Sequence, residues 1–330
     1  MLGTLRLLLA LAVAVSHAGI QLYGLNPGVV AVVGFYLISG YVMAGLIRRH
    51  YPRHRDAPGF YLDRAVRLMP QYLVYASLAL AWHLGFQHDA LPDSQSYFLS
   101  RSPNAEDIIN NLVIVPLNYY MWNGSDQYTL IPPAWSLGAE IQFYLIAPFL
   151  LLWPRRVLAV GAFSIVVYGL ALTGILNSDW YGYRLLPGVL SFFLLGALLN
   201  YLHYSRRYAA ATQLVVLVVV IAALAWVSLN HADLLNQPYN RETLLGLAFG
   251  LLLLHLLAVR SRKSWDDLAG DISYGVFLNH FLVLWVFFPG GVDLAVMPLF
   301  LGLCVVMSFA TQRLVERPLL AWRHRWRRIS

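Results

Sequence analysis

The chain has 330 residues, of which 59% are hydrophobic and only 12% are charged, and its mean hydropathy is +0.61. Soluble domains carry about 25% charged residues, so this composition excludes an ordinary soluble domain and predicts an integral membrane protein. The net charge of +7 is spread over several short loops rather than gathered in one domain, so we do not expect nucleic acid as a partner. The single cysteine, Cys304, cannot form an intrachain disulfide.

Ten apolar segments are long enough to span, or nearly span, a bilayer. In chain order they are 2–22, 27–47, 68–88, 133–153, 157–176, 185–203, 212–230, 243–259, 274–290 and 293–312. They predict an all-α integral membrane protein with about ten transmembrane helices in a single domain, residues 1–330.

The connection 89–132 is predicted to be one long extracytoplasmic loop within this domain. Its apolar run 108–115 fits either an interfacial or a re-entrant helix. Loops of this length are often functional. Its aromatic residues either stack on a sugar or belong to the interfacial aromatic belt.

Basic residues follow every second segment and set the orientation. The side with few of them receives Arg101, Arg184 and Arg241, and the other side receives 20 of the 23 Lys and Arg residues. Because an excess of Lys and Arg marks cytoplasmic loops, both termini are predicted to be cytoplasmic. The 20 residues are Arg6, Arg48, Arg49, Arg53, Arg55, Arg64, Arg67, Arg155, Arg156, Arg206, Arg207, Arg260, Arg262, Lys263, Arg313, Arg317, Arg323, Arg325, Arg327 and Arg328.

Residues 1–18 also fit a second interpretation. A basic residue, a short apolar run and small residues at Ser16 and Ala18 are typical of a cleavable secretory signal. Cleavage after Ala18 would remove His17 and put the termini on opposite sides. Because the apolar segment continues to Leu22, we favour a retained helix.

Arg6 and His17 are predicted to share one face of the first helix. Eleven residues turn a helix about three times plus roughly 20°, and they separate the two side chains by about 16 Å along the axis. Ionisable residues inside a span usually face a protein-lined cavity or pathway. The pair therefore predicts a polar passage from one membrane surface towards the middle.

Arg64 and Arg67 are three residues apart and are predicted to share a helix face at the cytoplasmic boundary. They fit two roles equally well. Either they anchor the chain to lipid phosphates, or they hold the phosphates of an anionic cytoplasmic ligand, for which arginine has suitable bidentate geometry.

Two further positions inside predicted spans carry ionisable side chains. Glu140, about two turns inside the outer boundary of the fourth segment, is expected to be paired with a cation or protonated. His280 of the ninth segment is either a hydrogen-bonded core residue or a direct participant in chemistry. No histidine spacing typical of a metal site is present, so no metal is expected.

Taken together, these elements resemble the membrane-bound acyltransferase 3 family. The ordered set of matching motifs is Arg6-x10-His17, Gly34 to Tyr41 ending Ser-Gly-Tyr, Arg64-x-x-Arg67-x-x-Pro70, Trp135-Ser136-Leu137-x-x-Glu140-x-x-Phe143-Tyr144, and Ser273-Tyr274 followed by His280. The chain ends soon after the tenth segment, so it resembles the stand-alone type without a C-terminal hydrolase-like domain.

The resemblance implies a multi-pass protein of the cytoplasmic (inner) membrane that takes an acyl group, most often acetyl, from acetyl-coenzyme A or another acyl-coenzyme A. The acceptor would be a hydroxyl of an outer-face glycan or glycolipid. Acyl-coenzyme A would act as donor substrate, with no permanently bound cofactor; the oligomeric state is open.

The resemblance also suggests roles for individual residues. His17 is expected to act as the general base, since histidine suits that role at neutral pH; a covalent acyl-histidine stays open. Glu140 is expected to support His17 by orienting it and raising its basicity, and the sequence leaves open that it orders an arginine instead. Arg6, Arg64 and Arg67 are expected to bind the donor. Further candidate site residues are Trp135, Ser136, Tyr274 and His280.

Two other functions fit the same composition. A proton-coupled transporter or flippase of a glycan precursor would also bury Arg, His and Glu, although its internal repeats are not evident. A non-catalytic membrane scaffold would tolerate replacement of His17.

Overall fold

The computed structural model describes residues 1–85, 97–204, 209–258, 260 and 263–319. Within these ranges the chain forms helices and no strand, apart from two isolated bridges. The predicted all-helical class is confirmed for this part of the chain. Part of the predicted outer loop (89–96) lies outside the described residues, as do Arg206, Arg207, Arg262, Arg323, Arg325, Arg327 and Arg328.

Each of the ten predicted apolar segments overlaps a helix, although α1 ends at His17, before the predicted end at residue 22, and α12 begins at Ser264, before the predicted start at residue 274. These helices are α1 (Leu2–His17), α2 (Pro27–His50), α3 (Ala57–Gly85), α7 (Ala134–Leu150), α8 (Pro154–Leu172), α9 (Leu186–Tyr204), α10 (Ala209–Asn230), α11 (Asn240–Ala258), α12 (Ser264–Phe287) and α13 (Met297–Thr311). Short turns of 3-10 helix are η1 (His54–Asp56), η2 (Val115–Tyr119), η3 (Ser125–Gln127) and η5 (Ala232–Asn236). Two turns of π-helix, η4 (Trp180–Arg184) and η6 (Gln312–Glu316), precede α9 and follow α13.

The apolar helices make the chain a multi-pass membrane protein. Among the described residues, six helices are long and apolar enough to cross a bilayer: Pro27–His50, Pro154–Leu172, Trp180–His203, Asn240–Ala258, Ser264–Phe287 and Met297–Leu319. The peripheral helices expose large apolar side chains, such as Phe163 of α8, Phe249 of α11 and Val306 of α13, each at least 55% exposed. A lipid environment accounts for such surfaces, which water disfavours.

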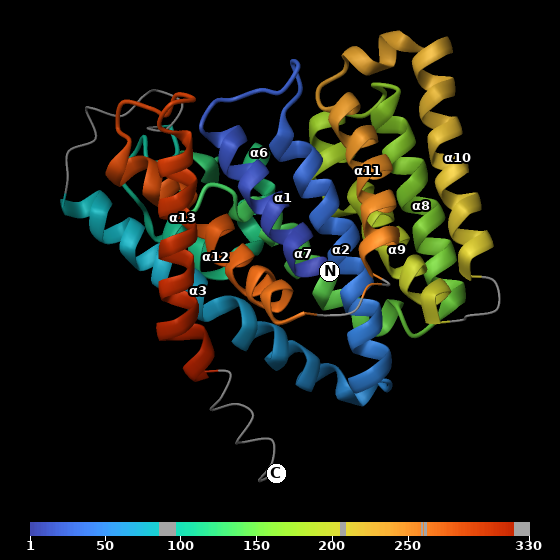
Figure 1. Ribbon diagram of the computed structural model, residues 1–330, viewed down its shortest axis with the longest axis horizontal. Coiled ribbons are helices and arrows are strands. Elements are labelled where there is room, and N and C mark those ends of the chain that lie inside the picture. The colour runs from blue at the N-terminus through green and yellow to red at the C-terminus, as the bar shows by residue number, and fades with distance from the viewer. Residues whose placement is uncertain (86–96, 205–208, 259, 261–262, 320–330) are drawn as a thin grey trace.

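The centre of the bundle is built on α2, which packs against α1, α9 and α11, while α1 also packs on α12 (Figure 1). The crossing of α2 and α9 requires glycine. A Cβ atom on Gly40 would lie 1.8 Å from the Phe193 carbonyl oxygen, and one on Gly196 would lie 1.9 Å from that of Leu37. Small residues let two membrane helices approach this closely.

Helix α3 begins earlier than the predicted apolar segment 68–88. It starts at Ala57, so Arg64 and Arg67, which were predicted to share a helix face, both lie within α3. Figure 1 shows α3 running obliquely across the lower part of the molecule, beneath the helices that stand more upright. Both arginines border a cavity together with residues of α1, α2, α7 and α12.

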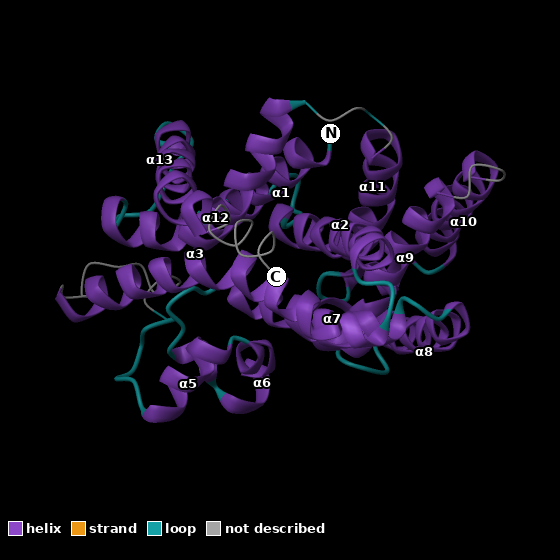
Figure 2. Ribbon diagram, turned by 90° about the horizontal axis from the view of Figure 1, so that it is seen from below, coloured by secondary structure: helices purple, strands orange, loops and turns teal. Residues whose placement is uncertain are grey.

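The described part of the outer loop, 97–132, folds into α5 (Ala105–Val113), η2, α6 (Tyr120–Asn123) and η3. Helices α5 and α6 lie together, beside α7 and α3 in the view from below (Figure 2). Helix α5 begins with a capping box, in which Asn104 and Asp107 bond each other's backbone amides. It buries Asn110 and Asn111 and exposes Ile108, Ile109, Leu112 and Val113. This pattern favours the interfacial interpretation of the apolar run.

Candidate active site

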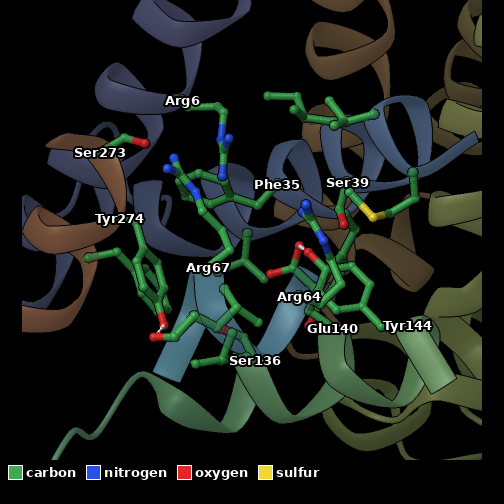
Figure 3. Close-up of a pocket in the computed structure, with 18 residues that line it drawn as sticks. Arg6, Phe35, Ser39, Arg64, Arg67, Ser136, Glu140, Tyr144, Ser273 and Tyr274 are labelled. Atoms are coloured by element: carbon green, nitrogen blue, oxygen red, sulfur yellow. Dashed lines mark hydrogen bonds between the residues drawn. The ribbon is translucent and has the colours of Figure 1, made fainter. Parts of the chain in front are cut away.

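A cavity of about 90 Å³ lies where α1, α2, α3, α7 and α12 meet. Its wall carries six of the predicted site residues: Arg6, Arg64, Arg67, Ser136, Glu140 and Tyr274. In Figure 3, Arg6 extends from α1 toward Arg67 of α3, while Arg64, Glu140 and Ser39 group beside them. Five helices, from α1 to α12, thus bring three cations and one carboxylate to a single cavity, which we call the inner cavity.

The three arginines of the inner cavity differ in their partners. Arg67 is paired with Glu316 of η6 and with Asp271, whose carboxylate oxygen lies 3.2 Å from Nη2. Arg64 is paired with its neighbour Asp63. Arg6 forms no ion pair or hydrogen bond with any described residue. An arginine without a partner retains all of its donors for an anionic ligand, and Arg6 is therefore the most available of the three.

Glu140 lies in the inner cavity and accepts a hydrogen bond of 2.5 Å from the hydroxyl of Tyr144, one helical turn along α7. No hydrogen bond joins Glu140 to His17 among the described residues, so the support of His17 by Glu140 stays a prediction. Within the described part of the chain, the side-chain hydrogen bond of His17 is made with His280 instead. Glu140 faces the arginines, so its contribution is to their charge balance.

His17 and His280 form a bonded pair with a defined tautomer. Nδ1 of His17 lies 2.9 Å from Nε2 of His280, and the two ring planes differ by only 5°. Nδ1 of His280 lies 3.1 Å from the carbonyl oxygen of Val276. Because a carbonyl only accepts, His280 carries its proton on Nδ1, and its Nε2 accepts from His17. The Nε2 lone pair of His17 is left for other chemistry.

Further cavities lie beside the inner cavity and share wall residues with it or with each other. Below the inner cavity lies one of about 790 Å³ that shares Arg6 and Arg67 with it. Above it, a cavity of about 200 Å³ shares Ser136 and Phe277 with the inner cavity and also borders His17. A cavity of about 260 Å³ on the side of the outer segment, the outer cavity, also borders His17. Arg6 and His17 thus border different cavities, and the predicted polar passage between them stays a prediction.

Arg184 is a site residue that the sequence did not single out. Arg184 borders the outer cavity, and it also borders the 200 Å³ cavity that shares Ser136 and Phe277 with the inner cavity. Its guanidinium lies over four aromatic rings, those of Trp135, Tyr183, Tyr120 and Tyr239, at 4.4, 5.0, 5.3 and 5.8 Å from the ring centres. Burial also raises the pKa of the Tyr120 phenol, which stays a neutral donor. The concentration of aromatic residues around a single outer-side arginine was the available sequence signal.

The remaining predicted residues have local roles. Trp135 borders the outer cavity. The Ser136 hydroxyl donates to the carbonyl of Pro133 at 3.0 Å, and the Tyr274 hydroxyl donates to that of Leu68 at 3.1 Å. Among the described residues, no group of three or more His, Cys, Asp or Glu side chains is placed to hold a metal ion.

Comparison with known proteins identifies the family. Residues 2–311 match the family model described as "Acyltransferase domain" (Acyl_transf_3). The chain belongs to this acyltransferase family. It is also similar to an uncharacterized protein of Aquifex aeolicus (strain VF5), which is 43% identical over 158 residues, or 47% of this chain and 71% of that protein. No solved structure matches the chain. The family assigns acyl transfer and gives no support to the transporter alternative.

Proposed function

We propose that the protein is a membrane O-acyltransferase. It moves an acyl group, in the first place acetyl, from cytoplasmic acetyl-coenzyme A to a hydroxyl of a glycan or glycolipid on the outer side of the cytoplasmic membrane. The protein crosses this membrane ten times with both termini in the cytoplasm. The observation that carries the proposal is the line of cavities that leads from three arginines, past His17, to the outer segment.

The donor enters from the side on which the basic residues gather. The 790 Å³ cavity is bordered by four arginines (Arg6, Arg49, Arg67 and Arg260) and three aspartates (Asp266, Asp267 and Asp271). Asp271 is paired with Arg67 and Asp266 with the N-terminal amine, and the other arginine side chains are suited to the phosphates of coenzyme A. The inner cavity is much narrower, with a volume of about 90 Å³. It admits a slender chain rather than a nucleotide. The phosphates therefore stay below while the pantetheine arm carries the thioester up to His17.

The reaction at His17 balances without a further reagent. The acceptor oxygen attacks the thioester carbonyl carbon while Nε2 of His17 removes the hydroxyl proton. The new carbon–oxygen bond forms, the carbon–sulfur bond breaks, and His17 returns the proton to the thiolate. The products are the ester and free coenzyme A. While His17 is positively charged, His280 still accepts its Nδ1 hydrogen and holds the ring in place.

The proposal is tested by the sidedness of the reaction in sealed membrane vesicles. Inside-out vesicles expose the cytoplasmic face and are expected to consume radiolabelled acetyl-coenzyme A added outside, with label appearing on lumenal glycans. Right-side-out vesicles are expected to show no consumption until they are permeabilised. Vesicles without the protein control for other enzymes. Equal use of the donor from both faces contradicts a passage with a single cytoplasmic entrance, and labelled acetyl-coenzyme A carried inward unchanged contradicts acyl transfer.

A further inference from the structure

The outer cavity is small and partly polar. Its volume is about 260 Å³, and His17 and Arg184 both border it. Typical ligand pockets measure about 300–1,000 Å³, so this cavity matches one sugar ring rather than an oligosaccharide. Phe98, Leu117 and Pro132 give it apolar walls, against which the C–H face of a ring can pack.

Hydrogen bonds to neighbouring residues hold the backbone at Arg184 and the side chain of Asp126 in place at the outer cavity. The Arg184 carbonyl accepts from Asn118 Nδ2 at 3.1 Å, and Asn118 Oδ1 accepts in turn from Gln142 of α7 at 2.9 Å. The carboxylate of Asp126 accepts a hydrogen bond of 3.0 Å from Tyr97. The outer segment, α7 and the start of α9 are thereby fixed to one another around the cavity. Preorganised walls of this kind are expected of a binding site.

Arg184 has N–H donors that are not used within the described part of the protein, and nearby carboxylates balance its positive charge. Its Nε donates a hydrogen bond of 2.6 Å to Asp179. Among the described residues, its guanidinium donates no other hydrogen bond. The side chain is only 14% exposed. The four N–H groups on its two Nη atoms are left to face the cavities that it borders. With Asp179 bonded to it and Asp126 in the wall, two carboxylates stand against one guanidinium.

We propose that the outer cavity is the acceptor subsite, that it takes one neutral sugar ring, and that Arg184 and Asp126 bind its hydroxyls so that one hydroxyl reaches His17. This inference rests on the proposed function and adds the class of acceptor. Arg184 donates to ring hydroxyl oxygens, and Asp126 accepts from hydroxyl groups. A uronic acid or a phosphorylated sugar is disfavoured because the two carboxylates repel it.

The test measures acetyl transfer by the protein in nanodiscs to a panel of methyl glycosides. Neutral members are the methyl glycosides of glucose, galactose, mannose, rhamnose and N-acetylglucosamine; acidic members are those of glucuronic and galacturonic acid. At least one neutral glycoside is expected to accept acetyl about tenfold or more better than either uronide. Equal or better transfer to the uronides overturns the proposal. So does transfer to no neutral glycoside by protein that consumes acetyl-coenzyme A.

A variant of Arg184 separates binding from structure. Arg184→Gln is expected to raise the KM for the neutral glycoside about 10- to 100-fold, the usual effect of losing a charge-assisted hydrogen bond, and the KM for acetyl-coenzyme A much less. Arg241→Gln is the matched control, since Arg241 is an exposed outer-side arginine that bonds only Leu235 and Asn236 among the described residues. Arg184→Lys, which keeps the charge, tests folding together with thermal stability. An unchanged acceptor KM in folded Arg184→Gln overturns the assignment of Arg184 while leaving acyl transfer intact, whereas absence of any donor use by the wild type defeats the proposed function itself.

Discussion

In the centre of the helix bundle, His17 of α1 donates its Nδ1 hydrogen to Nε2 of His280, 2.9 Å away on α12. The two histidines are 263 positions apart in the chain and are joined by this hydrogen bond. The imidazole ring of His280 is held in turn by the hydrogen bond from its Nδ1 to the Val276 carbonyl. The consequence is that Nε2 of His17 faces the cavities as an acceptor. This is the state that a general base requires.

Replacement of His280 tests this pairing. His280→Leu removes the acceptor for the Nδ1 hydrogen of His17, so we expect kcat to fall about 10- to 100-fold, the range for a misplaced catalytic group, with little change in either KM. His280→Gln provides an amide oxygen that accepts in the same place and is expected to recover part of kcat. Steady-state kinetics with both variants gives the answer. A kcat for His280→Leu equal to that of the wild type would show that the contact has no role in catalysis.

The arginines of the inner cavity are expected to separate into binding and structural residues. Arg6 has no ion-pair partner among the described residues, whereas Arg67 is paired with Glu316, which is 3% exposed. Arg6→Gln should therefore raise the KM for acetyl-coenzyme A about 10- to 100-fold. Arg67→Gln should in addition lower the free energy of unfolding by about 3–5 kcal/mol, because it removes the cation that pairs with the buried Glu316 carboxylate.

Donor binding and thermal unfolding measured on both variants check this difference. Arg313→Gln is a suitable control, because Arg313 lies on η6 but borders neither donor-side cavity. If Arg6→Gln proves the less stable of the two variants, the division of roles is wrong.

The α2–α9 crossing predicts a sharp effect of adding one methyl group. Gly40→Ala would place its Cβ atom 1.8 Å from the Phe193 carbonyl oxygen, and a clash with backbone forces the two helices apart. We expect a loss of about 1–3 kcal/mol or more and a lower melting temperature in detergent. Gly302→Ala is the control, since a Cβ atom there has no neighbour within 4 Å. Similar melting temperatures for both variants would mean that α2 and α9 are not packed so closely.

The orientation is testable by cysteine labelling in intact cells. The native Cys304 is fully buried and should not react, so the wild type serves as the control. A cysteine at the fully exposed Tyr23 should react with a membrane-impermeant maleimide added outside. A cysteine at Arg53, which is exposed between α2 and α3, should react only after permeabilisation. The reverse pattern would invert the proposed topology.

The positions of the helices along the chain were easier to predict from the sequence than the faces through which they contact one another. Hydropathy located segments that overlap ten helices of the described chain. Arg6 and His17 border separate cavities whose walls share Ser136 and Phe277. The depth of Glu140 along α7 was also readable, but its direction was not. Tertiary packing decides which face of α7 contacts which neighbouring helix. In this packing Glu140 borders the same cavity as the arginines, and His17 forms its hydrogen bond with His280.

Arg184 was overlooked for a related reason. In the chain it counted only as one of three outer-side charges. Its importance comes from Trp135, Tyr120 and Tyr239, which approach it from other segments, and from the π-helical turn that precedes α9. Such turns are frequent at functional sites, but they are not evident from hydropathy.

The most direct test of the account compares wild-type protein with His17→Ala in nanodiscs supplied with radiolabelled acetyl-coenzyme A and envelope glycans. The wild type is expected to release coenzyme A and label the glycans. His17→Ala, with an unchanged melting temperature, is expected to lose about 100- to 10,000-fold of this rate, the range for removal of a general base. Equal rates in the two proteins, or no acetyl transfer by folded wild type, would contradict His17-dependent acyl transfer.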